Sequence, residues 1–224
     1  MGAQSPRARR SRSRPTRERH RRILVVCGGK VTEPAYLGHL NSQLRTSGVR
    51  VEVARSGKDP ETLVREAIKH RATELRQAQA ADDPGNVYDE VWVMFDVDDF
   101  ADGVPRALEL AHRNRIRCAL SNPCFEIWLV WHIADANAYV TTRRAQQRAR
   151  DCGATRSGMV KSIDLSSISG RFADARARAI RADKDHNDLG RVFPHDNPRS
   201  DVYKLVDSIL DGIARARPGA QPLL

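Results

Sequence analysis

Apolar and polar positions follow two different periods along the first 135 residues. Residues 23–27 and 91–95 are unbroken apolar runs, which are typical of strands buried on both faces of a parallel sheet. Shorter runs predict strands at 49–54 and 116–120, and apolar residues at helical spacing predict helices at 32–44, 58–75, 104–114 and 125–133. Strands that alternate with helices form βαβ units, so the sequence predicts an α/β fold with a mostly parallel, Rossmann-like central sheet and flanking helices.

Local signals place the helix starts and the later elements. Thr32 is expected to cap the first helix, with Pro34 in its first turn. After residue 135 the pattern weakens. We expect helices there at 141–150, 172–182 and 202–214, and polar turns at 183–188 and 194–198.

The charge of the chain is concentrated at its N-terminus. Residues 1–22 hold nine arginines and one glutamate, a net charge of +8, whereas the whole chain carries +10. This tail has almost no apolar residues, so we expect it to be disordered and to attract phosphates without specificity; a solubilising extension is an equal alternative. The nearly neutral remainder is divided into an α/β core, 23–135, and a helical C-terminal part, 136–224, packed on it.

Other features of the sequence indicate the cellular compartment of the protein. No apolar run approaches the roughly 20 residues that cross a membrane, and the N-terminus lacks the apolar stretch of a secretory signal. The four cysteines form no C-x-x-C pair, which favours reduced thiols over disulfides or a zinc site. The sequence therefore predicts a cytoplasmic protein with no membrane partner.

An acidic cluster follows the second apolar run directly. In extended backbone, Asp96 and Asp98 point the same way and can chelate one hard cation, for which Mg²⁺ is the usual choice and Mn²⁺ the substitute. Three aspartates in four positions favour this metal site over the alternative, in which they are ordinary turn or capping residues. Asp99 is the candidate for that second role, as a cap of the next helix. Because ligands of parallel sheets bind beyond the carboxyl ends of strands, Gly28 and Gly29, after the first strand, are expected to lie nearby.

Three further residues are candidates for the same chemistry. Glu33 and Glu126 each lie in the first turn of a helix, where the helix dipole alone explains an acid, yet each is also placed to bind a metal or position a water. Lys161 follows a glycine-containing loop and is a candidate phosphate ligand, although a solvated lysine is the simpler interpretation. His132, His186 and His195 show no metal-binding spacing and are expected to be hydrogen-bonded or exposed.

These motifs resemble those of the RloB-like family, within the wider Toprim group. The matching segments come in the family's order, and the third is the most specific: residues 23–36, 91–100, 121–129 and 197–206. The resemblance implies a Toprim-like fold in which Asp96 and Asp98 correspond to the D-x-D that binds Mg²⁺, and Glu33 to the second acid of the first motif. It also implies nucleic-acid cleavage, RNA or DNA, in anti-phage defence beside an ATPase of the AAA or ABC type, and it leaves a homo-oligomer open.

The chain departs from the family pattern at one position. Where the family reads Cys-Glu-Gly, this chain has Cys27-Gly28-Gly29, and glycine offers no carboxylate. Three explanations are open: the protein is a naturally disabled member, the glycine is an introduced substitution, or Glu33 has taken over the role. We favour impaired catalysis over a transfer of the role to Glu33. The alternatives to a nuclease are a non-catalytic subunit that binds nucleic acid or a partner and a nucleotide-binding domain, which the missing G-x-G-x-x-G disfavours.

Overall fold

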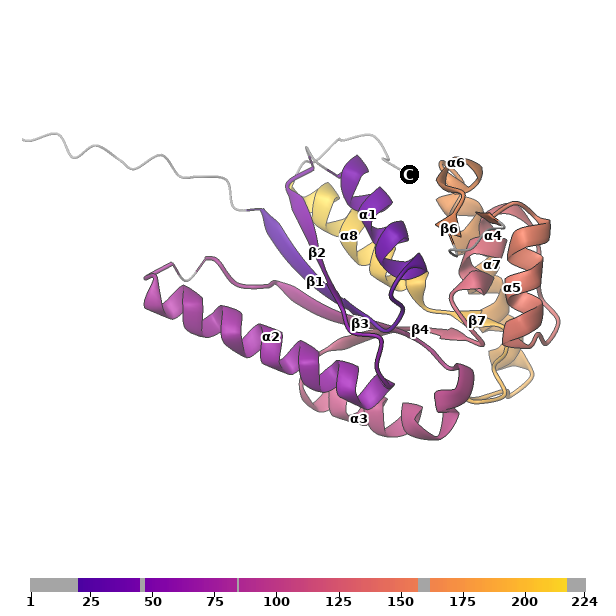
Figure 1. Ribbon diagram of the computed structural model, residues 1–224, viewed down its shortest axis with the longest axis horizontal. Coiled ribbons are helices and arrows are strands. Elements are labelled where there is room, and N and C mark those ends of the chain that lie inside the picture. Colours follow the sequence, from indigo (N-terminus) through magenta and orange to yellow (C-terminus); the bar gives the residue numbers. More distant parts are fainter. Residues whose placement is uncertain (1–19, 45–46, 84, 157–161, 217–224) are drawn as a thin grey trace, which may run out of the picture.

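The computed structural model describes residues 20–44, 47–83, 85–156 and 162–216 (Figure 1). The elements come in this order: β1 (Arg21–Cys27), α1 (Thr32–Gln43), β2 (Val49–Arg55), α2 (Pro60–Ala80), β3 (Glu90–Asp96), η1 (Asp98–Gly103), α3 (Val104–Arg113), β4 (Arg117–Asn122), α4 (Glu126–Ile133), α5 (Thr142–Asp151), β5 (Thr155–Arg156), β6 (Ser162–Ile163), α6 (Leu165–Ile168), α7 (Phe172–Asp188), β7 (Arg199–Ser200) and α8 (Val202–Ala216). Residues 1–19 and Lys161 lie outside the described residues, so the expectations for the tail and for this lysine are not addressed.

The central sheet has five strands in the order β2-β1-β3-β4-β7. β1 pairs in parallel with both β2 and β3, and β3 pairs in parallel with β4. Only β7, at the edge, runs antiparallel to its neighbour β4. The predicted α/β fold with a mostly parallel sheet is therefore confirmed.

Helices cover both faces of this sheet. Figure 1 shows α2 and α3 on one face and α1 and α8 on the other, with α4 to α7 grouped beyond β4 and β7. The side chains of β1 alternate accordingly: Leu24 and Val26 pack with α2 and α3, whereas Ile23, Val25 and Cys27 pack with α1, α4 and α8. The apolar runs read from the sequence are thus strands buried on two faces, which is why they show no alternation.

The start of the sheet differs from the expectation. β1 begins at Arg21, so Arg21 and Arg22 belong to the sheet rather than to the tail. The side chain of Arg21 pairs with Glu90, and that of Arg22 with Glu52 and Glu74. Partners this distant in sequence cannot be identified from the local composition, which at these positions is only arginine-rich.

Two helix boundaries are also different. Thr32 was expected to cap α1 but is its first residue; Val31 occupies the capping position, and the Thr32 hydroxyl donates to Glu33 Oε2 at 2.8 Å. Residues 183–188 were expected to form a polar turn, yet they are the last turns of α7. Their polar side chains have partners there: Asp183 accepts a hydrogen bond from the Tyr203 hydroxyl at 2.8 Å, and Lys184 pairs with Asp188.

The sequence pattern misses five short elements. The 3-10 helix η1, the two-residue strands β5 and β6, the four-residue helix α6 and the edge strand β7 are all too short to show a period. The edge strand β7 depends on residues far away in sequence, because Arg199 pairs with Asn122 and Ser200 with Ser121.

Candidate functional site

The acidic residues lie where β3 and β4 end together. Asp96 is the last residue of β3 and is paired in register with Ser121 of β4. Two backbone bonds continue this pairing past the strand: Val97 N donates to Ser121 O at 2.9 Å, and Asp98 N donates to Pro123 O at 3.0 Å. The end of β4 therefore fixes the backbone that carries Asp96 and Asp98.

The backbone turns sharply between the two aspartates. Val97 has helical dihedral angles and Asp98 a φ of 31°, at the start of η1. The expectation that Asp96 and Asp98 share a direction because the backbone is extended is therefore wrong. A positive φ disfavours most side chains, but aspartate is among the residues that tolerate it. The exposed Asp98 is held by its side chain as well, since Oδ1 accepts a hydrogen bond from the Thr142 hydroxyl at the start of α5.

Both aspartates influence the electrostatics of a buried thiol, that of Cys124. Burial raises the pKa of this thiol, the charge of Glu126 and then that of Asp96 raise it further, and a hydrogen bond with Glu126 and the charge of Asp98 add to the effect. Glu126, in the first turn of α4, is 1% exposed. The sequence pattern did not single out Cys124 or Thr142.

The β1–α1 turn lies beside this edge. Gly28 N donates to Met94 O at 2.8 Å, which extends the parallel pairing of β1 with β3. A Cβ at residue 28 would lie 3.1 Å from Leu63 Cδ1 and 3.4 Å from Phe95 Cβ. The tip of a leucine side chain can shift by the few tenths of an ångström needed, so position 28 has room for the start of a larger side chain.

Glu33 is buried within the same turn. Its Oε1 accepts a hydrogen bond from Gly29 N at 2.9 Å and its Oε2 accepts one from Thr32 Oγ1 at 2.8 Å. Burial raises the pKa of the neighbouring Cys27 thiol, and the Glu33 carboxylate raises it further. Both Glu33 oxygens thus bind the β1–α1 turn, whereas Asp96 and Asp98 follow β3 and Glu126 begins α4.

The donor set decides which metals this edge suits. Within the described ranges, no three His, Cys, Asp or Glu side chains lie close enough together to hold a metal ion. This arrangement differs from a closed structural zinc site, which takes four protein ligands. Mg²⁺ is commonly held by one or two carboxylates together with waters and substrate phosphates, so the oxygen donors of Asp96 and Asp98 fit it chemically. The side chain of Asp99 lies outside what the structure describes, although its backbone is part of η1.

A buried polar network supports the carboxyl end of β4. Asn122 Nδ2 donates to Asp196 Oδ1 at 2.9 Å, and Asn197 Nδ2 donates to Asn122 Oδ1 at 3.2 Å. Arg199 pairs with Asp196 at 2.7 Å and with Asp201 at 3.1 Å. Burial lowers the pKa of Arg199, but the charges of Asp201 and Asp196 outweigh it, and the pKa is raised. The predicted polar turn at 194–198 is therefore part of the scaffold beneath the candidate site.

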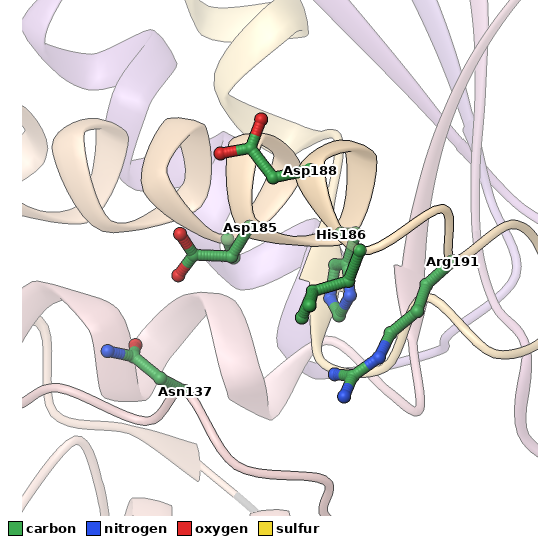
Figure 2. Close-up of a pocket in the computed structure, with 7 residues that line it drawn as sticks. Asn137, Asp185, His186, Asp188 and Arg191 are labelled. Atoms are coloured by element: carbon green, nitrogen blue, oxygen red, sulfur yellow. The ribbon is translucent and has the colours of Figure 1, made fainter.

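The histidines behave as expected. His132 Nδ1 lies 2.9 Å from Trp128 O, His186 Nε2 donates to Pro198 O at 2.9 Å, and His195 is exposed. His186 lines a pocket of about 360 Å³. Figure 2 shows Asp185 and Asp188 on the same helix end as His186, Arg191 just beyond it and Asn137 on a separate segment. Asp96, Asp98 and Glu126 are not among the residues that line this pocket.

Taken together, these features define a class of protein: a mixed α/β protein with acidic residues gathered at the carboxyl edge of its parallel strands. A family model described as RloB-like protein matches residues 23–209. This match spans most of the chain, which therefore belongs to the RloB-like family. No curated protein and no solved structure gives a match. In the described part of the chain, no helix is both long and apolar enough to span a bilayer.

Proposed function

We propose that this protein is a Toprim-type, Mg²⁺-dependent nuclease whose turnover is impaired by Gly28. The observation that carries the proposal is the position of three acids beyond neighbouring parallel strands: Asp96 ends β3, Asp98 N donates to Pro123 O at 3.0 Å just past β4, and Glu126 begins α4. Ligand sites of parallel sheets lie at this edge, and carboxylates gathered there suit a hard cation and a phosphodiester.

Each acidic residue has a role in this proposal. Asp96 and Asp98 hold Mg²⁺ or Mn²⁺, with Asp99 and Glu33 as further ligand candidates. A bound divalent cation supplies Lewis-acid chemistry toward a phosphodiester. Glu126 orients water or completes the ligand set from the start of α4, and Lys161 contacts a substrate phosphate.

Gly28 limits what this site can do. The family resemblance places a glutamate at residue 28, where this chain has neither a carboxylate nor a proton to transfer. General acid–base groups contribute roughly 10²- to 10⁴-fold to a rate. Glu33 does not replace the missing group in our proposal, because hydrogen bonds from Gly29 and Thr32 fix its carboxylate within the β1–α1 turn, five residues further along the chain than residue 28.

The same glycine favours a second candidate function, a non-catalytic regulatory subunit that binds nucleic acid or a partner protein. Both candidates share one biological setting, which rests on the family resemblance: anti-phage defence in the cytoplasm, alongside an ATPase partner of the AAA or ABC type. In that setting the chain would recognise a nucleic acid, and the missing carboxylate would distinguish a sensor from an enzyme.

The test is a comparison of three proteins: this chain, Gly28→Glu, and Gly28→Glu combined with Asp96→Asn. Each is incubated with tRNA, single-stranded RNA, single-stranded DNA and duplex DNA in Mg²⁺ or Mn²⁺, alone and with any ATPase that co-purifies with the tagged chain. We expect Gly28→Glu to cleave at least one substrate about 100-fold faster than this chain, at the lower end of the range for an acid–base group. The added Asp96→Asn should abolish that gain. If Gly28→Glu cleaves nothing faster than the double variant, the nuclease proposal fails and the binding subunit remains.

A further inference from the structure

The α5 helix presents a basic surface next to the acidic edge. Its sequence, TRRAQQRARD, holds four arginines and one aspartate, a net charge of +3. Ala145 and Ala149 are its buried residues, and the helix packs through that side on α4. All four arginines are exposed on the remaining surface. A helix with small residues inward and arginines outward places its charge where a large ligand can reach it.

This charge is not neutralised by the protein itself. Among the residues that the structure describes, Arg143, Arg144 and Arg148 have no carboxylate partner, and Arg150 donates to the amide oxygen of Gln147. On the neighbouring α7, by contrast, Arg176 is paired with Asp207 and Arg178 with Asp135. The α5 arginines therefore keep their full attraction for a negatively charged ligand.

A groove runs along this surface. It has a volume of about 590 Å³, and its lining residues include Tyr139, Thr141, Arg144 and Arg148, together with one carboxylate, that of Asp151. Arg144 and Arg148 are four residues apart and so lie on one face of the helix. Tyr139 is 76% exposed, although it carries a large aromatic ring. An exposed aromatic ring beside unpaired arginines is the combination that holds an unstacked base and its phosphates.

The groove is linked to the candidate site through the start of α5. Thr141 caps the helix, with Oγ1 accepting from Arg144 N at 3.4 Å, and the next residue, Thr142, donates to Asp98 Oδ1. The residue before the cap is fixed too: Val140 N donates to Asn197 Oδ1 and Val140 O accepts from Asn197 Nδ2, both at 3.0 Å. One end of the groove is therefore held beside Asp98.

We propose that this groove binds a single-stranded nucleic acid, with a base stacked on Tyr139 and phosphates on Arg144 and Arg148. The inference names the substrate class of the proposed nuclease and rests on that proposal only for the strand's path toward Asp98; binding itself does not require cleavage. A single strand fits better than a duplex because a ring can stack only on a base that has left its own stack. An acidic protein could form ion pairs with the arginines, but its binding would not explain the exposed ring of Tyr139.

The experiment measures the anisotropy of a fluorescein-labelled oligouridylate of about 12 nucleotides, within the usual site sizes of single-strand binders. The full chain is titrated in EDTA at several salt concentrations. The test variant is Arg144→Glu with Arg148→Glu. The matched control is Lys69→Glu with Arg76→Glu on α2, two exposed positions with the same charge change on the opposite face of the sheet. Every protein keeps residues 1–22, so the contribution of this segment cancels.

We expect the test variant to bind at least about 10-fold more weakly than the control, with a salt slope lower by about 1.4, since each lost phosphate contact on a single strand accounts for roughly 0.7. Tyr139→Ala should weaken binding roughly 5- to 150-fold, the range for a lost stacking ring, and Tyr139→Phe should restore it. Oligothymidylate in place of oligouridylate distinguishes DNA from RNA as the source of the strand. An RNA duplex of equal length should bind more weakly than the single strand.

Several results overturn the inference. Equal binding by the α5 and α2 variants excludes the groove, and equal binding of duplex and single strand excludes the role of Tyr139. Polyglutamate that binds through α5 as tightly as the oligonucleotide indicates an acidic protein partner instead. Because EDTA separates binding from cleavage, an inert Gly28→Glu with intact α5-dependent binding refutes only the nuclease. Cleavage by Gly28→Glu with α5-independent binding refutes only the groove.

Discussion

The backbone of Gly29 lies so close to the Glu33 carboxylate that any side chain at residue 29 should displace it. A Cβ at residue 29 would lie within 3.0 Å of both carboxylate oxygens of Glu33, closer than real Cβ contacts come. The carboxylate is the end of a side chain and can move, but Glu33 is 2% exposed and is surrounded by protein. Gly29→Ala should therefore force Glu33 out of its position without distorting the strand itself.

The cost follows from the two hydrogen bonds that Glu33 accepts, at 2.9 Å from Gly29 N and 2.8 Å from Thr32 Oγ1. Hydrogen bonds to a charged group contribute about 1.5–3 kcal/mol each, so their loss costs about 3 kcal/mol at the lower end of that range. Alanine also lowers the conformational entropy of the unfolded chain, which stabilises the folded state by about 0.4–1 kcal/mol. We expect the free energy of unfolding to fall by about 2–3 kcal/mol.

Urea unfolding of a double-mutant cycle measures this effect. In a Glu33→Ala background the carboxylate that the new Cβ would meet is gone, so Gly29→Ala should be neutral or should stabilise the folded state by up to about 1 kcal/mol through the unfolded chain. A coupling of at least about 1 kcal/mol is thus expected between the two positions. If Gly29→Ala costs the same in both backgrounds, Glu33 does not occupy the position that the structure gives it.

Three further predictions concern single positions. Burial lowers the pKa of His132 to about 4, so protonation favours the unfolded chain as the pH falls below 6.5, and the free energy of unfolding should fall by about 3 kcal/mol by pH 4. Urea unfolding should show this loss, and His132→Phe should make the free energy of unfolding less dependent on pH. Asp98→Gly and Asp98→Val both lose the bond to Thr142, and because Asp98 has a φ of 31°, Asp98→Val should be less stable than Asp98→Gly by about 1–2 kcal/mol; equal melting temperatures of the two variants would contradict the backbone geometry. Asn197→Ala removes both bonds to Val140 and should lower stability by about 2–3 kcal/mol and speed amide exchange at Val140; unchanged exchange would show that Asn197 does not hold this segment.

Much of the fold follows from local pattern. The strands β1 and β3 are apolar runs too continuous for surface strands. The helix α2 begins where Asp59 and Pro60 predict its start, and the Asp59 side chain accepts a hydrogen bond from Thr62 N at 3.0 Å. The order of strands and the position of β7 at the edge depend instead on contacts between residues far apart in sequence. Arg199 gives no local sign of a strand, and it pairs with Asn122, a residue far away in the sequence.

The candidate site was predictable only in part. Asp96 and Asp98 are conspicuous because they follow five apolar residues, but the turn at Val97 depends on backbone bonds to Ser121 and Pro123, which sequence spacing does not show. Cys124 could have been noticed as a cysteine two residues before Glu126, directly after the Ser121-Asn122-Pro123 turn. Thr142 carries no such signal, because its bond to Asp98 joins segments separated by 43 intervening residues.

The proposed function requires that Asp96 and Asp98 hold a divalent cation. Mn²⁺ binding measured by electron paramagnetic resonance tests this requirement directly, because bound Mn²⁺ loses the signal of the free ion and activity is not needed. We expect one site in the full chain, displaced by excess Mg²⁺ and weakened at least about 10-fold by Asp96→Asn or Asp98→Asn, which keep the shape of each side chain but remove its charge. Mn²⁺ binding that is absent from the full chain, or that persists unchanged in both variants, would contradict it.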